Sequence, residues 1–302
     1  MSRPRVAVLL ASYDGAAFLD EQLDSILGQE GVDVHVVVSD DGSTDGTLEL
    51  LEARRRADVR LSLLPALAPS GSSAANFARL LRDADLSDVD LVAMSDQDDV
   101  WLPGKLARHA AILAGGDVQG VSSDVTAVSP DGRRRLVRKA FPQRSYDWVC
   151  ESPGPGSTFL LTPALVDLVR AVLRDHPDRV AAVDYNDWLV YALCRARGWR
   201  WHIDDRATVD YRQHAANVMG ANLGLRARFG RLLQARDGWH RRQALAVLDA
   251  GVVVAPDPEP LRALRGVIAD GSRLALARRA PELRRRARDR AALAALVLAG
   301  SW

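Results

Sequence analysis

The chain has 302 residues, of which 48% are hydrophobic and 26% are charged, enough for one large domain or two modest ones with a buried core. This composition argues against a disordered chain, a collagen-like repeat and a small disulfide-stapled protein. Cys150 and Cys194 have no CxxC spacing, so we expect two buried, reduced thiols and no zinc knuckle or dithiol motif. The apolar runs Val6–Ala11 and Ala291–Ala299 are too short for a signal core or a membrane span, which predicts a cytoplasmic protein.

The net charge of +1 hides an asymmetry between the two ends of the chain. Residues 221–302 carry sixteen Arg against seven Asp and Glu, a balance of +9, so the first 220 residues carry −8. A basic tail on a mildly acidic body suggests a negatively charged partner near the tail, and a solvated helical face is the simpler interpretation. Only Lys105 and Lys139 are lysines, so the enrichment in arginine runs through the whole chain.

Apolar strand runs alternate with helical patterns over the first 113 residues. Four successive units of a strand followed by a helix predict a parallel α/β sheet of Rossmann-like type. The strands are expected at Val6–Ala11, Val34–Ser39, Val59–Leu64 and Leu91–Ser95, and the helices at Phe18–Gln29, Asp45–Arg56, Ser72–Ala84 and Pro103–Leu113.

After Gly120 the pattern changes to shorter strands and then to helices. Beyond Asn222 the chain is predicted to be helical, with breaks near residues 256–258 and near Pro281. We therefore expect residues 1–220 to form an α/β domain and residues 221–302 to form a basic helical extension. The other elements are expected at Val121–Val128, Phe159–Leu161, Trp199–Ile203 and Thr208–Tyr211 as strands, and at Pro163–Asp175 and Asp187–Arg197 as helices.

Several common chemistries leave no motif in this chain. There is no GxxxxGK[ST] phosphate loop, no complete GxGxxG fingerprint after a strand, no HExxH and no GxSxG. The six histidines include no close pair suited to zinc. Nucleotide hydrolysis by a P-loop, dinucleotide redox chemistry, zinc chemistry and serine hydrolysis therefore all lose ground.

Carboxylates follow the second and the fourth predicted strand, as SDDGSTDGT at residues 39–47 and SDQDDVW at residues 95–101. Turns and a helix cap explain Ser43, Thr44 and Asp45 well. Five aspartates behind two apolar strands are better explained by a cation among them, because like charges repel and ligands bind at this edge of α/β sheets. The D-x-D spacing of Asp96 and Asp98 suits Mg²⁺ or Mn²⁺, which takes one or two carboxylates plus phosphate oxygens.

Three segments resemble the N-terminal hallmarks of family 2 glycosyltransferases with the GT-A fold: VAVLLASYDG at 6–15, VVVSDDGSTDGT at 36–47 and MSDQDDVWLPGKL at 94–106. The resemblance covers roughly residues 5–220 and implies a mixed, mostly parallel sheet flanked by helices. The motif SDQDDVWLPGKL, together with YRQH at 211–214 and Asn217, is most similar to bacterial rhamnosyltransferases of surface polysaccharide synthesis.

The resemblance implies a nucleotide site at the ends of the first two strands. Ala11, Ser12 and Tyr13 would line the base, and Tyr13 would either stack on it or simply pack. Asp41 would accept a hydrogen bond from N3 of uracil or thymine. Asn76 would flank the nucleotide or, on the alternative interpretation, cap its own helix.

The same resemblance assigns roles to the other carboxylates. Asp96 would meet the ribose or the metal shell, and Asp98 would bridge a divalent cation, Mg²⁺ or Mn²⁺, to the diphosphate. Asp187 is the expected general base, ahead of Asp184, for which a helix cap is the more comfortable interpretation. Asp40 is expected to support its loop.

The sugar side of the site is expected near a small-residue loop. Gly156 and Ser157 resemble the loop beneath the donor sugar, where small residues allow close approach. Trp188 is expected beside the donor or acceptor sugar. His214 would face the diphosphate or the metal, or would be satisfied structurally, and Trp101 is expected in the core.

The reaction that the resemblance implies is an inverting, metal-dependent transfer of a sugar, L-rhamnose from dTDP-L-rhamnose, to a hydroxyl of a saccharide acceptor, which could be lipid-linked. A UDP-hexose donor is the main alternative. A sugar nucleotidyltransferase would need a glycine-rich basic loop, which residues 12–18 lack, and intact carboxylates argue against a catalytically dead binding module. We expect no nucleic-acid partner. The arginine-rich tail could rest on the inner face of the plasma membrane or form a dimer interface, and the oligomeric state stays open.

Overall fold

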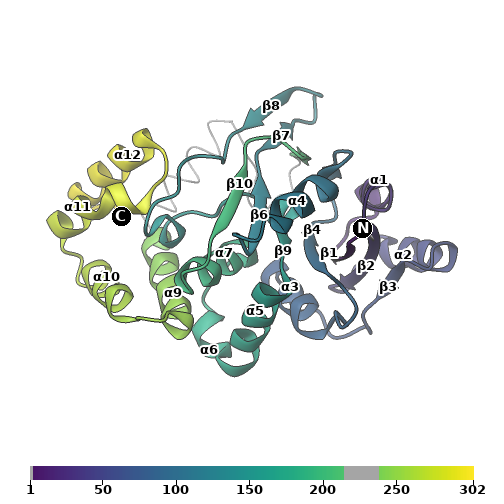
Figure 1. Cartoon of the computed structure of the whole chain (residues 1–302), viewed down its shortest axis with the longest axis horizontal. Helices are drawn as coiled ribbons and strands as arrows, with labels where there is room; N and C mark the ends of the chain where they lie inside the picture. The colour runs from purple at the N-terminus through teal and green to yellow at the C-terminus, as the bar shows by residue number, and fades with distance from the viewer. Residues whose placement is uncertain (1–2, 214–237) are drawn as a thin grey trace.

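The computed structural model describes residues 3–213 and 238–302. Figure 1 shows a central sheet with helices packed around it, with α2 and β3 at one end of the molecule and the C-terminal helices at the other. Within the described ranges, we find no helix with the length and apolar character needed to cross a bilayer.

The main sheet has seven strands, and all but one of them run parallel. The exception is β9, which pairs antiparallel with β4 and β6. Ser12 at the end of β1 lies opposite Asp40 on β2, and Leu10 lies opposite Ser95 on β4, so the acidic segments emerge at one edge. The strand order is β10 (Trp201–Asp204), β6 (Gly120–Ser123), β9 (Leu160–Leu161), β4 (Leu91–Ser95), β1 (Arg5–Ser12), β2 (Asp33–Asp40), β3 (Leu61–Leu63).

Helices cover both faces of this sheet, which explains the unbroken apolar run in the first strand. Val8 and Leu10 of β1 belong to the core cluster beneath α1, α2 and α4, whereas Leu9 belongs to the cluster beneath α3, α5 and α7. The four predicted strand–helix units are confirmed. The helices are α1 (Ala16–Leu27), α2 (Thr47–Ala57), α3 (Ser73–Asp83), α4 (Lys105–Ala114), α5 (Pro163–Asp175), α6 (Pro177–Val180) and α7 (Asn186–Ala196).

The single strand expected at 121–128 is wrong, because it divides between two sheets. β6 ends at Ser123 and β7 (Val125–Val128) joins a four-stranded sheet. The buried Asp124 lies at the bend, where its carboxylate accepts hydrogen bonds from Lys139 N and Ala140 N at 2.5 and 2.9 Å. The small sheet has the order β5 (Val100–Trp101), β11 (Val209–Arg212), β7, β8 (Arg134–Val137).

The C-terminal part consists of α9 (Trp239–Val254), α10 (Glu259–Ala269), α11 (Arg273–Leu283) and α12 (Ala287–Leu298). The break at 256–258 is confirmed. The break expected near Pro281 comes later, because α11 runs through that proline and the chain becomes extended only at 284–286. Val247 and Leu248 of α9 are buried in the same core cluster as α7. The domain boundary at residue 220 stays a prediction.

Both thiols are buried and unbonded, as expected. Burial raises the pKa of Cys150 and of Cys194 to about 12, so each stays protonated near neutral pH and packs as a small apolar group.

Candidate active site

The loops after β1 and β2 are tied together by the first aspartate of the DDGS segment. Asp40 Oδ2 accepts a hydrogen bond from Ser12 Oγ at 2.8 Å, and Oδ1 accepts one from Ser43 N at 2.8 Å. Ser43 Oγ donates to the same carboxylate at 2.5 Å. Asp40 therefore supports the loop, as the sequence predicts. Ala11, beside Ser12, is buried at the end of the strand.

Asp41 extends from the same loop toward the segment that precedes α3. Its carboxylate accepts hydrogen bonds from Ser70 N at 2.6 Å and Gly71 N at 3.0 Å. A carboxylate has about four lone-pair sites, so two bonds leave acceptor capacity for a nucleobase N–H.

The aromatic ring of Tyr13 is 57% exposed, so the interpretation that it simply packs is wrong. Its backbone is held from the acidic loop: Gln97 Oε1 accepts from Tyr13 N, and Gln97 Nε2 donates to Tyr13 O, both at 2.7 Å. The loops after β1 and β4 thus form one surface. Gln97 was missed by sequence reasoning, and its only signal is its place between two aspartates.

Asn76 bridges the carboxyl ends of two strands from its place on α3. Its buried Nδ2 donates to Ser39 O at 2.9 Å and to Ser12 O at 3.2 Å. The capping role belongs to Ser72, whose Oγ accepts from Ala75 N, so the capping alternative for Asn76 is wrong. Asn76 therefore holds the ends of β1 and β2 in place.

Three carboxylates from different elements converge below this surface. Burial raises the pKa of Asp96 to about 7, and the neighbouring charges of Asp98 and Asp187 add to that shift. Asp96 and Asp98 follow β4, and Asp187 lies in the first turn of α7. Repulsion between neighbouring carboxylates is relieved when one of them is protonated or when a cation binds between them.

Asp99 lies behind them and is fully buried. Burial and the nearby Asp98 and Asp96 raise its pKa well above the ordinary value. Its carboxylate accepts a hydrogen bond from Arg212 N at 3.3 Å, so β11 brings the YRQ segment to the acidic loop. His214 lies outside the described residues, and the expectation for it stays untested.

Asp187 lies in the first turn of α7, where Tyr185 is the N-cap residue without a side-chain bond. Its carboxylate accepts from Trp188 N at 2.7 Å and from Ser152 Oγ at 3.1 Å. Burial raises its pKa to about 6, although these hydrogen bonds and the nearby Lys139 oppose the shift. Asp184 does not act as the cap either, because its carboxylate accepts from Trp239 Nε1 at 2.6 Å.

The small-residue loop lies directly against this carboxylate. A Cβ added to Gly156, at the start of the 3-10 turn η2 (Gly156–Thr158), would lie 3.5 Å from Asp187 Cβ. Ser157 is fully buried beside Asp99. Trp188 differs from the expected sugar contact: its ring is 5% exposed and its Nε1 donates to Trp148 O at 2.6 Å. Its side chain therefore supports α7 from the core.

Lys139 is, after Gln97, a second residue of the site that sequence reasoning did not assign. Burial and Arg285 lower its pKa, while the nearby Asp187 and Glu151 oppose that shift. The available signal was composition, since Lys139 is one of two lysines among 40 basic residues. The other, Lys105, is buried with Nζ 3.4 Å from the centroid of the Trp101 ring. The expectation that Trp101 belongs to the core is confirmed.

The donor set suits a hard cation that completes its shell with substrate. Within the described ranges, no three His, Cys, Asp or Glu side chains form a complete metal cluster. Mg²⁺ and Mn²⁺ need only one or two carboxylates when diphosphate and water oxygens are present. Asp96 and Asp98 fit that requirement, since burial and then the neighbouring charge of Asp98 raise the pKa of Asp96.

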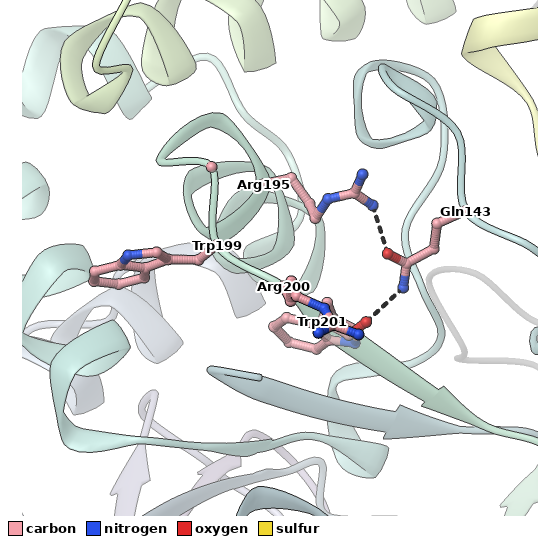
Figure 2. A pocket seen from close by; sticks show the side chains of 6 residues that line it. Gln143, Arg195, Trp199, Arg200 and Trp201 are labelled. Atoms are coloured by element: carbon pink, nitrogen blue, oxygen red, sulfur yellow. Dashed lines mark hydrogen bonds between the residues drawn. The ribbon is translucent and has the colours of Figure 1, made fainter. Parts of the chain in front are cut away.

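A separate pocket of about 300 Å³ lies at the start of β10 (Figure 2) and contains none of these carboxylates. It is lined by Gln143, Arg195, Gly198, Trp199, Arg200 and Trp201.

The model of the family described as "Glycosyl transferase family 2" matches residues 7–167. The chain is 34% identical over 242 residues to the dTDP-rhamnosyl transferase RfbG of Shigella flexneri, covering 80% of this chain and 84% of that protein. It is 29% identical over 111 residues to the putative teichuronic acid biosynthesis glycosyltransferase TuaG of Bacillus subtilis, covering 37% and 42%. The chain therefore belongs to glycosyltransferase family 2 and is a glycosyltransferase.

Solved structures show the same fold. S. aureus TarS in complex with UDP-GlcNAc superposes with a TM-score of 0.57 at 18% identity, covering 87% of this chain and 70% of that one. The mannosyltransferase PcManGT from Pyrobaculum calidifontis, in complex with GDP-Man and Mn²⁺, gives 0.54 at 20% identity, covering 99% and 86%. The expected GT-A fold is confirmed.

Proposed function

We propose that this glycosyltransferase is inverting and metal-dependent and moves L-rhamnose from dTDP-L-rhamnose to a hydroxyl of a saccharide acceptor. The observation that carries the proposal is the meeting of Asp96, Asp98 and Asp187 at the edge of the sheet where ligands bind. The donor is supported by 34% identity over 80% of the chain to a protein named as a dTDP-rhamnosyl transferase.

The nucleotide would lie across the ends of β1 and β2. The exposed ring of Tyr13 offers a face for the base, and Asp41 has acceptor capacity for its N3–H. Ser12 and Ala11 form the buried floor beneath it. Thymine and uracil share that N–H, so this pattern admits both bases and excludes neither.

Asp98 and Asp96 would hold Mg²⁺ or Mn²⁺. When bound, the cation supplies positive charge against the negative charge that develops on the leaving diphosphate. Asp96 is near enough to Asp187 for the two charges to interact, and Gly156 lies against Asp187, so diphosphate and sugar would lie between the acidic loop and the start of α7.

Asp187 would accept the proton of the attacking hydroxyl. Its pKa of about 6 leaves it ionised at neutral pH while making it a stronger base than an ordinary aspartate. Transfer with inversion requires the base and the leaving group on opposite faces of the sugar, and Asp187 and Asp98 come from different elements of the site.

Calorimetric titration with dTDP, UDP and GDP, each with and without Mn²⁺, tests the proposal. We expect Mn²⁺-dependent binding of dTDP, lost in Asp98→Ala, and release of dTDP from dTDP-L-rhamnose when a saccharide acceptor is added. Tighter binding of UDP with turnover of a UDP-hexose would favour the alternative donor. Absence of metal-dependent nucleotide binding would overturn the proposed mechanism.

The proposal includes contact between the C-terminal helices and an anionic lipid surface that carries the acceptor. Arg285 belongs to the arginine-rich tail but is buried, so it would not contact lipid. Arg288, Leu274 and Leu298 remain exposed on α11 and α12, a combination that suits an interface. We expect salt-sensitive co-sedimentation with phosphatidylglycerol vesicles, weakened by Arg288→Glu. Co-sedimentation unaffected by salt and by that substitution would remove the lipid contact from the proposal.

A further inference from the structure

We propose that Arg285, in the extended segment between α11 and α12, is a positioning residue that acts on the base Asp187 through Ser152. The inference rests on the proposed function, because it takes Asp187 to be the group that accepts the proton. It makes the C-terminal helices part of the catalytic apparatus, although Arg285 itself touches no substrate.

Arg285 is 4% exposed, and it donates hydrogen bonds to residues 147–152 of the catalytic half of the chain. Its backbone N donates to Glu151 Oε1 at 2.5 Å. Its guanidinium donates from Nη2 to Ser152 O at 2.6 Å and from Nη1 to Asp147 Oδ2 at 3.3 Å. The planar fork of an arginine can hold a backbone carbonyl and a carboxylate together in a fixed geometry. Residues 147–152 are thus fastened from outside the sheet.

The last residue of that stretch, Ser152, contacts the proposed base. Ser152 Oγ lies 3.1 Å from Asp187 Oδ2 and 2.8 Å from Gly154 O, and its single proton can be donated to either oxygen. The chain then continues to Gly156, which packs against Asp187. Displacement of the Ser152 backbone would therefore move a hydrogen-bond donor of the base and the floor of the sugar site together.

The helix that carries Asp187 is fastened to the same stretch. The fully buried Asp147 accepts from Tyr191 Oη at 3.0 Å and from Arg195 Nη1 at 3.2 Å, one and two turns beyond Asp187 on α7. Figure 2 shows Arg195 also donating to Gln143, at 2.8 Å. Asp147 lies between Arg195 of α7 and Arg285 of the C-terminal segment. Arg285 therefore connects the segment between α11 and α12 to the helix that carries the base.

The consequence is a dependence of kcat on a residue outside the reacting groups. A shift of about 1 Å in a catalytic group can cost about 100-fold in rate. The nucleotide side is formed by the ends of β1, β2 and β4, which Arg285 does not contact. The loss should therefore fall on kcat and spare nucleotide affinity.

The experiment compares Arg285→Lys, Ser152→Ala and the double variant in the full chain. We expect kcat to fall about 100-fold in R285K and about 10-fold in S152A, the loss of one hydrogen bond to a charged group. The donor KM and the Kd for dTDP with Mn²⁺ should stay within about 3-fold. Because Arg285 and Ser152 act on Asp187 through the same contacts, the kcat of the double variant should be no lower than that of R285K alone.

Arg265→Lys is the matched control, because Arg265 lies in the same extension and makes a two-bond ion pair with Asp249, at 2.5 and 3.0 Å. Its kcat should stay within about 2-fold of the wild type, since partly exposed pairs of this kind contribute little. The inference would be overturned if the kcat losses of R285K and S152A multiplied in the double variant. A wild-type kcat in R285K would overturn it as well.

If R285K does not fold, Glu151→Gln removes a charged partner of Arg285 and keeps its size. An unchanged kcat in a folded E151Q would equally overturn the inference, whereas a reduced kcat at unchanged dTDP affinity supports it. Failure of the proposed function can be distinguished from failure of this inference. If the proposed function is wrong, the wild-type protein itself shows no metal-dependent nucleotide binding, before any variant is compared.

Discussion

Single side chains in this protein take their chemistry from what surrounds them. Asp187 and Asp184 are three residues apart in one acidic segment, and the sequence ranks them only by resemblance to a family. Their surroundings separate them: Asp187 lies beside Ser152 and the acidic loop with its pKa raised to about 6, whereas Asp184 bonds Trp239 on α9. A base needs both reach and a suitable pKa.

We expect Asp187→Asn to lower the rate of sugar transfer about 1,000-fold, within the range of general-base catalysis. Nucleotide binding should stay close to the wild-type value, because Asp187 is proposed to act on the acceptor hydroxyl and not on the nucleotide. Steady-state kinetics with dTDP-L-rhamnose and calorimetry with dTDP measure the two effects. Asp184→Asn is the control, with a rate within a few-fold of the wild type; a larger loss there than in D187N would reverse the assignment.

Asp96 should make the protein less stable as pH rises. Its pKa is raised from 3.8 to about 7 in the folded state, so the folded chain binds a proton that the unfolded chain releases. The stabilisation from this group is complete below about pH 4 and is lost as pH rises through about 7. In EDTA, the Tm of Asp96→Asn relative to the wild type should increase between pH 5 and pH 8; parallel curves would contradict this.

At the scale of elements, the site depends on how strand ends are joined. The alternation of strands and helices over residues 5–114 follows from the sequence, because strands buried on both faces need unbroken apolar runs. The division at Asp124 does not follow, since an aspartate inside the segment VSSDVTAV at 121–128 does not distinguish a solvent-facing strand position from a change of sheet. Because of that division, β7 pairs with β11, which pairs with β5 on its other side and brings Arg212 N to Asp99.

Asn76→Ala tests the join between β1 and β2. It removes the Nδ2 donor that Ser12 O and Ser39 O share, while Ser12 O keeps its hydrogen bond from Asp41 N, so we expect a loss of about 1–3 kcal/mol in the free energy of unfolding. The affinity for dTDP should fall as well, because the loops after both strands lose their common support. Urea denaturation and calorimetry measure the two quantities.

Ser72→Ala is the control on the same helix. Loss of the N-cap should cost about 1 kcal/mol in the free energy of unfolding with the affinity for dTDP unchanged, since Ser72 bonds only within α3 and its neighbouring turn. Equal affinities in N76A and S72A would show that the bridge between the strands has no part in nucleotide binding.

At the scale of the whole molecule, the C-terminal helices belong to the same core as the catalytic half. Ala244, Val247 and Leu248 of α9 are fully buried in the cluster that contains α7. We therefore expect a chain ending at residue 220 to lose cooperative thermal unfolding, because it exposes the face of α7 that α9 covers. Circular dichroism melts measure this, and a truncated chain with a near-native Tm would contradict it.

The sequence by itself determined the family, the α/β alternation and the positions of the acidic segments, because apolar periodicity and short motifs are local properties of the chain. Only the tertiary structure decided that Asp96, Asp98 and Asp187 meet, that Trp188 belongs to the core, and that Arg285 of the basic tail is buried against residues 147–152. Those outcomes depend on contacts between segments as many as 138 residues apart. Such contacts are set by how strands and helices pack, and no stretch of sequence specifies them alone.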